Sequence, residues 1–334
     1  MGAARAGGPR RPGPSHRGRI GVVINVAAID IGSNSTRLLI LAPSGGELAR
    51  EVTITKLGAG VDATGILAAD AVERTVASLR SYAATLEHHG VSADRLRVTT
   101  TSASRDATNR GEFFELVESV VGRQPELLNG AEEAELSFRG ATSWLSARAN
   151  EWGEPRYDVV VDIGGGSTEL AVGRPGEDPI GVWSIDAGCV RFTEQWLRGN
   201  PPSAEELSNA VTVMHSHLDD AEREIPELKS ADRLIGVAGS IVTVAAVEIG
   251  LATYDRHRLH GFVVTRAAAE DVFRTLATEN RRDRAHNPGL AADRVDTIVA
   301  GALILVVVMR HWNHDRCLVS EADSLDAAAR SMLR

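Results

Sequence analysis

A nine-residue segment occurs twice in this chain of 334 residues. Residues 30–38 read Asp-Ile-Gly-Ser-Asn-Ser-Thr-Arg-Leu, and residues 162–170 read Asp-Ile-Gly-Gly-Gly-Ser-Thr-Glu-Leu. The copies agree at six of nine positions and start 132 residues apart. Each copy follows an apolar, strand-like run and leads into another one. The repeat therefore predicts a chain built from a duplicated domain.

The repeated turn has the composition of an anion-binding loop. Glycine lets the backbone N–H groups approach an anion closely, and Ser33, Ser35 and Ser167 can add hydroxyl donors. Asp30 and Asp162 end the preceding strands, where a carboxylate can hold a hydrated divalent cation. A single glycine-rich hairpin is usually a plain turn, but two such loops on opposite domains would hold a phosphate chain from both sides.

Charge and length narrow the class of protein. The net charge is −9, which argues against a nucleic-acid partner, so arginines, backbone N–H groups and metal ions must attract any phosphate locally. Neither lysine, Lys56 or Lys229, follows the glycine frame of a Walker loop. The isolated cysteines, Cys189 and Cys317, fit a reducing cytoplasm. The apolar run 298–309 is too short to span a membrane and predicts a buried helix.

Strand and helix patterns alternate along the chain, which is typical of the α/β class. Residues 1–19 contain five Arg, three Pro, five Gly and no acid, so we expect a disordered basic arm, with a polyanion-binding tail as the alternative. Ser203 and Glu206 form a capping-box pattern that predicts a helix start. The basic residues 256–260 read as a loop. Strands are expected at 21–31, 36–42, 97–101, 157–161, 169–172 and 234–237, and helices at 72–86, after 203 and after 239.

Three further motifs follow in order: Thr-Thr-Ser-Ala-Ser-Arg-Asp-Ala-Thr-Asn at 100–109, Gly-Ala-Glu-Glu-Ala at 130–134 and Gly-Val-Ala-Gly-Ser at 236–240. With the two loops, residues 26–334 resemble the exopolyphosphatase/guanosine pentaphosphate phosphohydrolase family of the actin-like ATPase fold. The resemblance implies two duplicated actin-like (ribonuclease H-like) domains flanking a cleft. Domain I would span 20–131, with a C-terminal helix at about 323–334 packing back on it, and domain II would span 132–322.

The resemblance also implies roles for particular residues. Glu133 matches the general base, with Glu169 as a second catalytic acid. Asp162 and Glu169 match acids implicated in binding water and Mg²⁺, or Mn²⁺ in its place. Asp30 is a further candidate metal ligand because of its place before the first turn. Gly239 and Ser240 match a loop that lies beside the substrate or nucleotide. The phosphate-binding residues would be Gly32, Ser33, Asn34, Ser35, Arg105, Gly164, Gly165, Gly166 and Ser167.

The implied activity is a hydrolase that releases terminal orthophosphate from inorganic polyphosphate or guanosine pentaphosphate. A glutamate would activate water and a divalent metal would neutralise charge. Two alternatives stay open: an ATP-dependent kinase of the same fold, and a non-catalytic sensor of polyphosphate or alarmone nucleotides. From the residues alone, Glu132 and Glu133 are also typical first-turn helix acids. Family analogy further suggests a homodimer in the cytoplasm, without a membrane partner.

Overall fold

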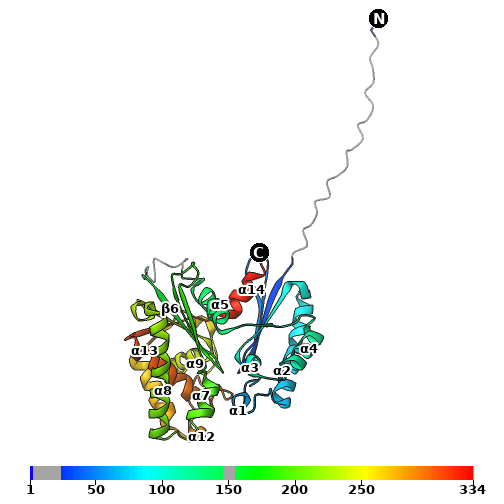
Figure 1. Ribbon diagram of the computed structural model, residues 1–334. Coiled ribbons are helices and arrows are strands. Elements are labelled where there is room, and N and C mark those ends of the chain that lie inside the picture. Colours follow the sequence, from blue (N-terminus) through cyan, green and yellow to red (C-terminus); the bar gives the residue numbers. More distant parts are fainter. Residues whose placement is uncertain (3–23, 146–154, 334) are drawn as a thin grey trace.

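The computed structural model describes residues 1–2, 24–145 and 155–333. The predicted basic arm, 1–19, lies outside the described residues apart from its first two. The chain forms two lobes that stand side by side, each built around one β-sheet (Figure 1).

The sheet of the first lobe has the strand order β3-β2-β1-β4-β5. β1, β2 and β3 form an antiparallel meander, and β4 and β5 run parallel to β1. Alternate residues of β1 enter two different apolar clusters, because α2 covers one face of the sheet and α14 the other. The bounds are β1 Val26–Ile31, β2 Ser35–Leu41, β3 Glu47–Ile54, α1 Val61–Thr64, α2 Ala69–His88, η1 Ala93–Arg95, β4 Leu96–Thr100, α3 Ser102–Asp106, α4 Arg110–Val121 and β5 Glu126–Leu127.

The sheet of the second lobe has the order β10-β11-β9-β6-β7-β8. Its strands β8-β7-β6-β9-β11 repeat the order and directions of the first sheet, and β10 is an added antiparallel edge. This repetition confirms the predicted duplicated α/β architecture. The strands are β6 Asp158–Ile163, β7 Thr168–Gly173, β8 Gly181–Ile185, β9 Arg233–Val237, β10 Val263–Thr265 and β11 Arg316–Val319.

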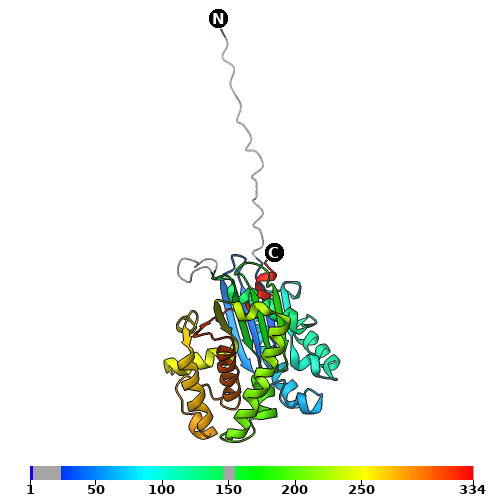
Figure 2. The ribbon, with the colours of Figure 1, turned by 60° about the vertical axis from the view of Figure 1, so that its left-hand side comes forward.

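The helices of the second lobe pack along its sheet (Figure 2). At their centre α13 is buried from Ile298 to Met309, as the apolar run predicts, and it packs against α7, α8, α9 and α11. No helix in the described parts of the chain is long and apolar enough to cross a membrane. The bounds are α7 Cys189–Trp196, α8 Ala204–Glu224, η3 Pro226–Ser230, α9 Ala238–Ile249, α10 Arg256–Leu259, α11 Arg266–Thr278, α12 Arg281–Arg284 and α13 Ile298–His311.

The predicted starts of individual strands and helices agree only in part with the structure. The capping box of Ser203 and Glu206 begins α8, as expected. The first strand begins at Val26, and residues 21–23 of its predicted range lie outside the described residues. Residues 256–259 form the short helix α10 rather than a loop, because the Asp255 carboxylate accepts hydrogen bonds from the N–H groups of His257 and Arg258.

Two helices connect the lobes at the top of the view in Figure 1. α5 (Gly130–Thr142) packs against β7 and β8 of the second lobe and against α14 (Ser324–Ser331), which itself packs on β1 and β2. The crossing of α5 and α14 is tight, since a methyl group at Gly140 would overlap the Asp323 carbonyl. The close approach joins the last turn of α5 to the N-terminus of α14.

Candidate functional site

The two copies of the repeat fold into the same hairpin. In the first, the N–H of Gly32 donates to the Ser35 carbonyl at 2.9 Å; in the second, the N–H of Gly164 donates to the Ser167 carbonyl at 3.0 Å. The two turns are also equally tight: a methyl group at Gly32 would lie 3.2 Å from the Ser35 carbonyl oxygen, and one at Gly164 would lie 3.2 Å from the Ser167 carbonyl oxygen. The repeated sequence therefore produces two equivalent turns, one per lobe.

The two turns face each other across the gap between the lobes. A methyl group at Gly165 would lie 3.0 Å from the backbone nitrogen of Asn34 and 3.0 Å from Cβ of Ser33. At Gly166 it would lie 2.4 Å from Oγ of Ser102, which in turn is 2.8 Å from Oγ of Ser33. A larger residue at either position would crowd the first turn, and the close approach brings the N–H groups of both turns near one another.

A cavity of about 960 Å³ opens between the lobes at the two turns. Among the predicted site residues, Gly166, Arg105 and Glu169 do not line it. Gly166 instead faces Ser33 and Ser102. The predicted residues that do line it are Asp30, Gly32, Ser33, Asn34, Ser35, Glu133, Asp162, Gly164, Gly165, Ser167, Gly239 and Ser240.

The two acids at the start of α5 have different surroundings. Glu132 completes a capping box with Asn129: its N–H donates to the Asn129 side chain at 3.0 Å, and its Oε2 accepts from the Asn129 N–H at 2.8 Å. Glu133 lines the cavity, and its Oε2 atom is buried without a hydrogen-bond partner. Of the two glutamates, only Glu132 therefore caps the N-terminus of α5.

Carboxylates crowd behind the second turn. Glu169 lies opposite Asp162 in the pairing of β6 with β7, and its Oε2 is also buried without a partner. Hydrogen bonds hold the other oxygens, because Ser184 donates to Glu169 at 2.8 Å and Ser137 donates to Asp162. Ser137 lies one turn after Glu133 on α5, so the same face of this helix carries Glu133 and the hydroxyl that binds Asp162.

Burial and mutual repulsion raise the pKa values of these carboxyl groups. Burial and then Asp162 raise the pKa of Glu169 to about 8. Burial and then Asp323 raise the pKa of Asp162 to about 6. Burial and then Glu169 raise the pKa of Glu133 well above its usual range. Proton or cation binding at this cluster is therefore favourable.

Arg105, on α3, is a cation that acts on both glutamates of this cluster. Its positive charge lowers the pKa values of both Glu133 and Glu169, and its Nη1 donates to the Leu128 carbonyl at 3.1 Å. That bond leaves its other guanidinium donors without a bond to protein atoms that the structure shows. The remaining N–H donors of Arg105 are therefore available to a ligand near the two glutamates.

The carboxylates fit a magnesium ion in chemistry and charge. Mg²⁺ binds oxygen atoms and typically takes one or two carboxylates, completing its shell with water and substrate phosphate. The unpartnered oxygen of Glu169 is a suitable donor. Across residues 24–145 and 155–333, no three His, Cys, Asp or Glu side chains converge on one point, so the predicted set of Asp30, Asp162 and Glu169 does not form a single ligand cluster.

Asp30 in particular is occupied by other groups. Its Oδ2 accepts from Nε and Nη2 of Arg37 at 3.2 and 2.6 Å, and its Oδ1 accepts from Thr99 at 3.1 Å. Arg37 lies directly opposite Asp30 in the pairing of β1 with β2. The carboxylate that the sequence suggests as a metal ligand therefore binds an arginine here.

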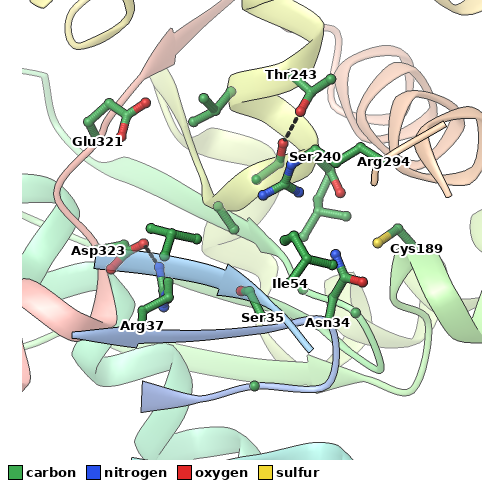
Figure 3. Close-up of a pocket in the computed structure, with 18 of the residues that line it drawn as sticks. Asn34, Ser35, Arg37, Ile54, Cys189, Ser240, Thr243, Arg294, Glu321 and Asp323 are labelled. Carbon is green, nitrogen blue, oxygen red and sulfur yellow. Dashed lines mark hydrogen bonds and ion pairs between the residues drawn. The ribbon is translucent and has the colours of Figure 1, made fainter. Parts of the chain in front are cut away.

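The cavity extends from the turns to the start of α9 (Figure 3). The guanidinium of Arg294 lies against Gly239 and beside Ser240, since a methyl group at Gly239 would lie 2.1–2.4 Å from it. Thr243 Oγ1 donates to the Gly239 carbonyl at 2.6 Å and so braces the first turn of α9. A side chain at position 239 would therefore displace the Arg294 guanidinium.

Several cavity residues are absent from the sequence-based set. These residues are Arg37, Glu47, Arg50, Tyr254, Arg256, Arg294, Glu321 and Asp323. Arg37 lies within the first copy of the repeat. No motif marks the others, which come from segments that only the tertiary fold brings together.

Comparison with known proteins identifies the family. The model of the Ppx/GppA phosphatase family matches residues 42–324. The chain belongs to this family. It is 38% identical over 323 residues to exopolyphosphatase 2 of Mycobacterium tuberculosis, covering 92% of this chain and 98% of that protein. It is also 30% identical over 291 residues to the guanosine-5'-triphosphate,3'-diphosphate pyrophosphatase of Aeromonas salmonicida, of which it spans 55%.

Solved structures of Ppx/GppA proteins have the same fold. An exopolyphosphatase-like protein matches with a TM-score of 0.84 at 34% identity, over 91% of this chain and 97% of that one. The PPX-GPPA enzyme of Aquifex aeolicus matches with a TM-score of 0.76 at 29% identity, over 92% of this chain and 99% of that one. These matches confirm both the predicted family and the predicted fold class.

Proposed function

We propose that this Ppx/GppA protein is a phosphoanhydride hydrolase that releases terminal orthophosphate from inorganic polyphosphate or guanosine pentaphosphate. The observation that carries the proposal is the position of Glu133, whose carboxylate has an unpartnered buried oxygen and lines the cavity onto which both anion-binding turns open. A base and an anion cradle in one cavity are what hydrolysis of a phosphoanhydride requires. The names of the relatives point to the same substrates.

The residues divide the work between binding and proton transfer. The N–H groups and hydroxyls of the two turns hold the terminal phosphates, and Arg105 opposes the charge that develops on them. Glu133 orients a water molecule and takes its proton as the water oxygen bonds to the terminal phosphorus. The bridging P–O bond breaks, and its electron pair stays on the shortened chain.

Asp162 and Glu169 are the carboxylates that would hold Mg²⁺ or Mn²⁺. When bound, the cation supplies positive charge to the phosphate oxygens. Their crowding, together with the raised pKa values, supports this assignment. Gly239, Ser240 and Arg294 form the wall along which the rest of the substrate lies.

The test measures orthophosphate release, with magnesium, from tripolyphosphate, long-chain polyphosphate, guanosine pentaphosphate and ATP in parallel. Release from polyphosphate or the pentaphosphate supports the proposal, and the ratio of the two rates identifies the preferred substrate. Transfer of the ATP phosphate to an added acceptor would show that the protein is a kinase and not a hydrolase. Binding of these compounds without release of phosphate from any of them would show that it is a sensor.

A further inference from the structure

The arginines in the cavity differ in whether an acid pairs with them. Arg37, Arg50 and Arg256 each have a carboxylate partner within 4 Å. Among the cavity residues that the structure describes, Arg294 forms no such ion pair. Positive charge is therefore available to a substrate at Arg294, beside the start of α9, and is neutralised at the other three arginines.

Arg37 is the most completely neutralised of the three. Nε and Nη2 donate to Asp30, Nη1 donates to Asp323, and Nη2 also reaches Ser324 Oγ at 3.3 Å. Every nitrogen of the guanidinium therefore has a protein partner. The group of one arginine and two carboxylates has a net charge of −1, so a phosphate that approached it would be repelled.

Asp323 comes from a distant part of the chain and has two separate contacts. It is the N-cap of α14, where its Oδ1 accepts from the Leu325 N–H at 3.0 Å. Its Oδ2 pairs with Arg37, as the dashed line in Figure 3 shows. The cap needs an oxygen acceptor but no charge, whereas the pairing with Arg37 depends on the charge.

We infer that Asp323 is a specificity-determining residue: by pairing with Arg37 it keeps that guanidinium from phosphate oxygens and weakens the binding of inorganic phosphate chains. The inference rests on the proposed function for the chemical class of the ligand, but it concerns binding and not hydrolysis. A phosphate chain is then held by the two turns, Arg105 and Arg294, without help from the Arg37 wall.

Asp323→Asn separates the two contacts, because asparagine keeps the capping oxygen and loses the charge. The ligand is a methylene-bridged triphosphate, whose P–C–P links are not hydrolysed, titrated calorimetrically into the full chain. We expect Asp323→Asn to lower its Kd at least tenfold, roughly the size of one relieved like-charge contact. Asp315→Asn, which removes an exposed acid paired with Arg266, serves as the matched control and should leave the Kd unchanged.

The route through Arg37 is tested with the double variant Arg37→Gln/Asp323→Asn, which removes both partners of the pair. Its Kd should return to the wild-type value or rise above it. An unchanged Kd in Asp323→Asn, or a gain that persists in the double variant, overturns the inference. Asp323→Ser, which also caps a helix without charge, repeats the test if the asparagine variant unfolds. Tighter binding by Asp323→Asn, together with no phosphate release by the wild type, would contradict the proposed hydrolase activity but support the inference about Asp323.

Discussion

Arg37 and Glu169 occupy the same position in the two copies of the repeat and carry opposite charges. Each lies across its hairpin from the aspartate that begins the copy, Asp30 for Arg37 and Asp162 for Glu169. In the first copy the arginine neutralises the aspartate, whereas in the second the two carboxylates repel each other. The duplicated loops are thus alike in shape and unlike in charge, which is why we assign the metal to the second lobe.

The raised pKa of Glu169 predicts a pH-dependent stability. Its pKa is about 8 in the folded chain and near 4.5 when unfolded, so the folded state binds the proton more tightly. This stabilisation is complete below about pH 4.5 and is lost as the pH rises through 8. Urea unfolding in EDTA should show the free energy of unfolding falling over that window. The fall should be shallower in Glu169→Gln; an equal slope in both proteins would contradict the assignment.

Magnesium should reverse this trend. A cation that binds the ionised carboxylates competes with their protons, so saturating Mg²⁺ should raise the melting temperature most at pH 8 and least at pH 5. Melting curves with and without EDTA at the two pH values provide the measurement. In Asp162→Asn the magnesium effect should disappear. A magnesium effect that is the same at both pH values would place the ion elsewhere.

Gly188 predicts a strong steric effect. A methyl group there would lie 2.4 Å from the backbone carbonyl of Gly165, within the second turn. Gly188→Ala should therefore cost about 1–3 kcal/mol of unfolding free energy and distort the turn. Gly111→Ala is the control, because a methyl group there meets nothing within 4 Å, and in helix α4 it should be neutral or stabilising. Equal denaturation midpoints for the two variants would contradict the predicted crowding.

Arg105 should affect binding and catalysis together. Removing its charge in Arg105→Gln takes away a donor to the phosphates and further raises the pKa of Glu133. We expect kcat/KM to fall by roughly 10²-fold or more, as for other charge-assisted contacts in a transition state. Arg123→Gln, an exposed arginine elsewhere in the first lobe, should match the wild type. If both variants kept wild-type kcat/KM, Arg105 would have no part in the site.

The repeated motif was sufficient to predict a duplicated domain, because the same nine-residue pattern encodes the same strand–turn–strand in each lobe, whereas the actin-like architecture was predicted from the family resemblance. The charge relationships were harder to predict. Glu132 and Glu133 are adjacent in sequence, and only the capping contact with Asn129 distinguishes them. The pairing of Arg37 with Asp323 joins residues 286 positions apart, and local sequence contains no signal for it. The same holds for Arg294 against Gly239, which depends on how α9 meets a distant loop.

The most direct test of the central claim compares Glu133→Gln with Glu132→Gln. Glutamine at 132 keeps the oxygen that the capping box needs, so this neighbour is a matched control for folding. With magnesium and the preferred phosphate substrate, we expect kcat to fall about 10²–10⁴-fold in Glu133→Gln. We expect Glu132→Gln to stay close to the wild type. Equal phosphate release by the two folded variants would contradict Glu133 as the base that activates water.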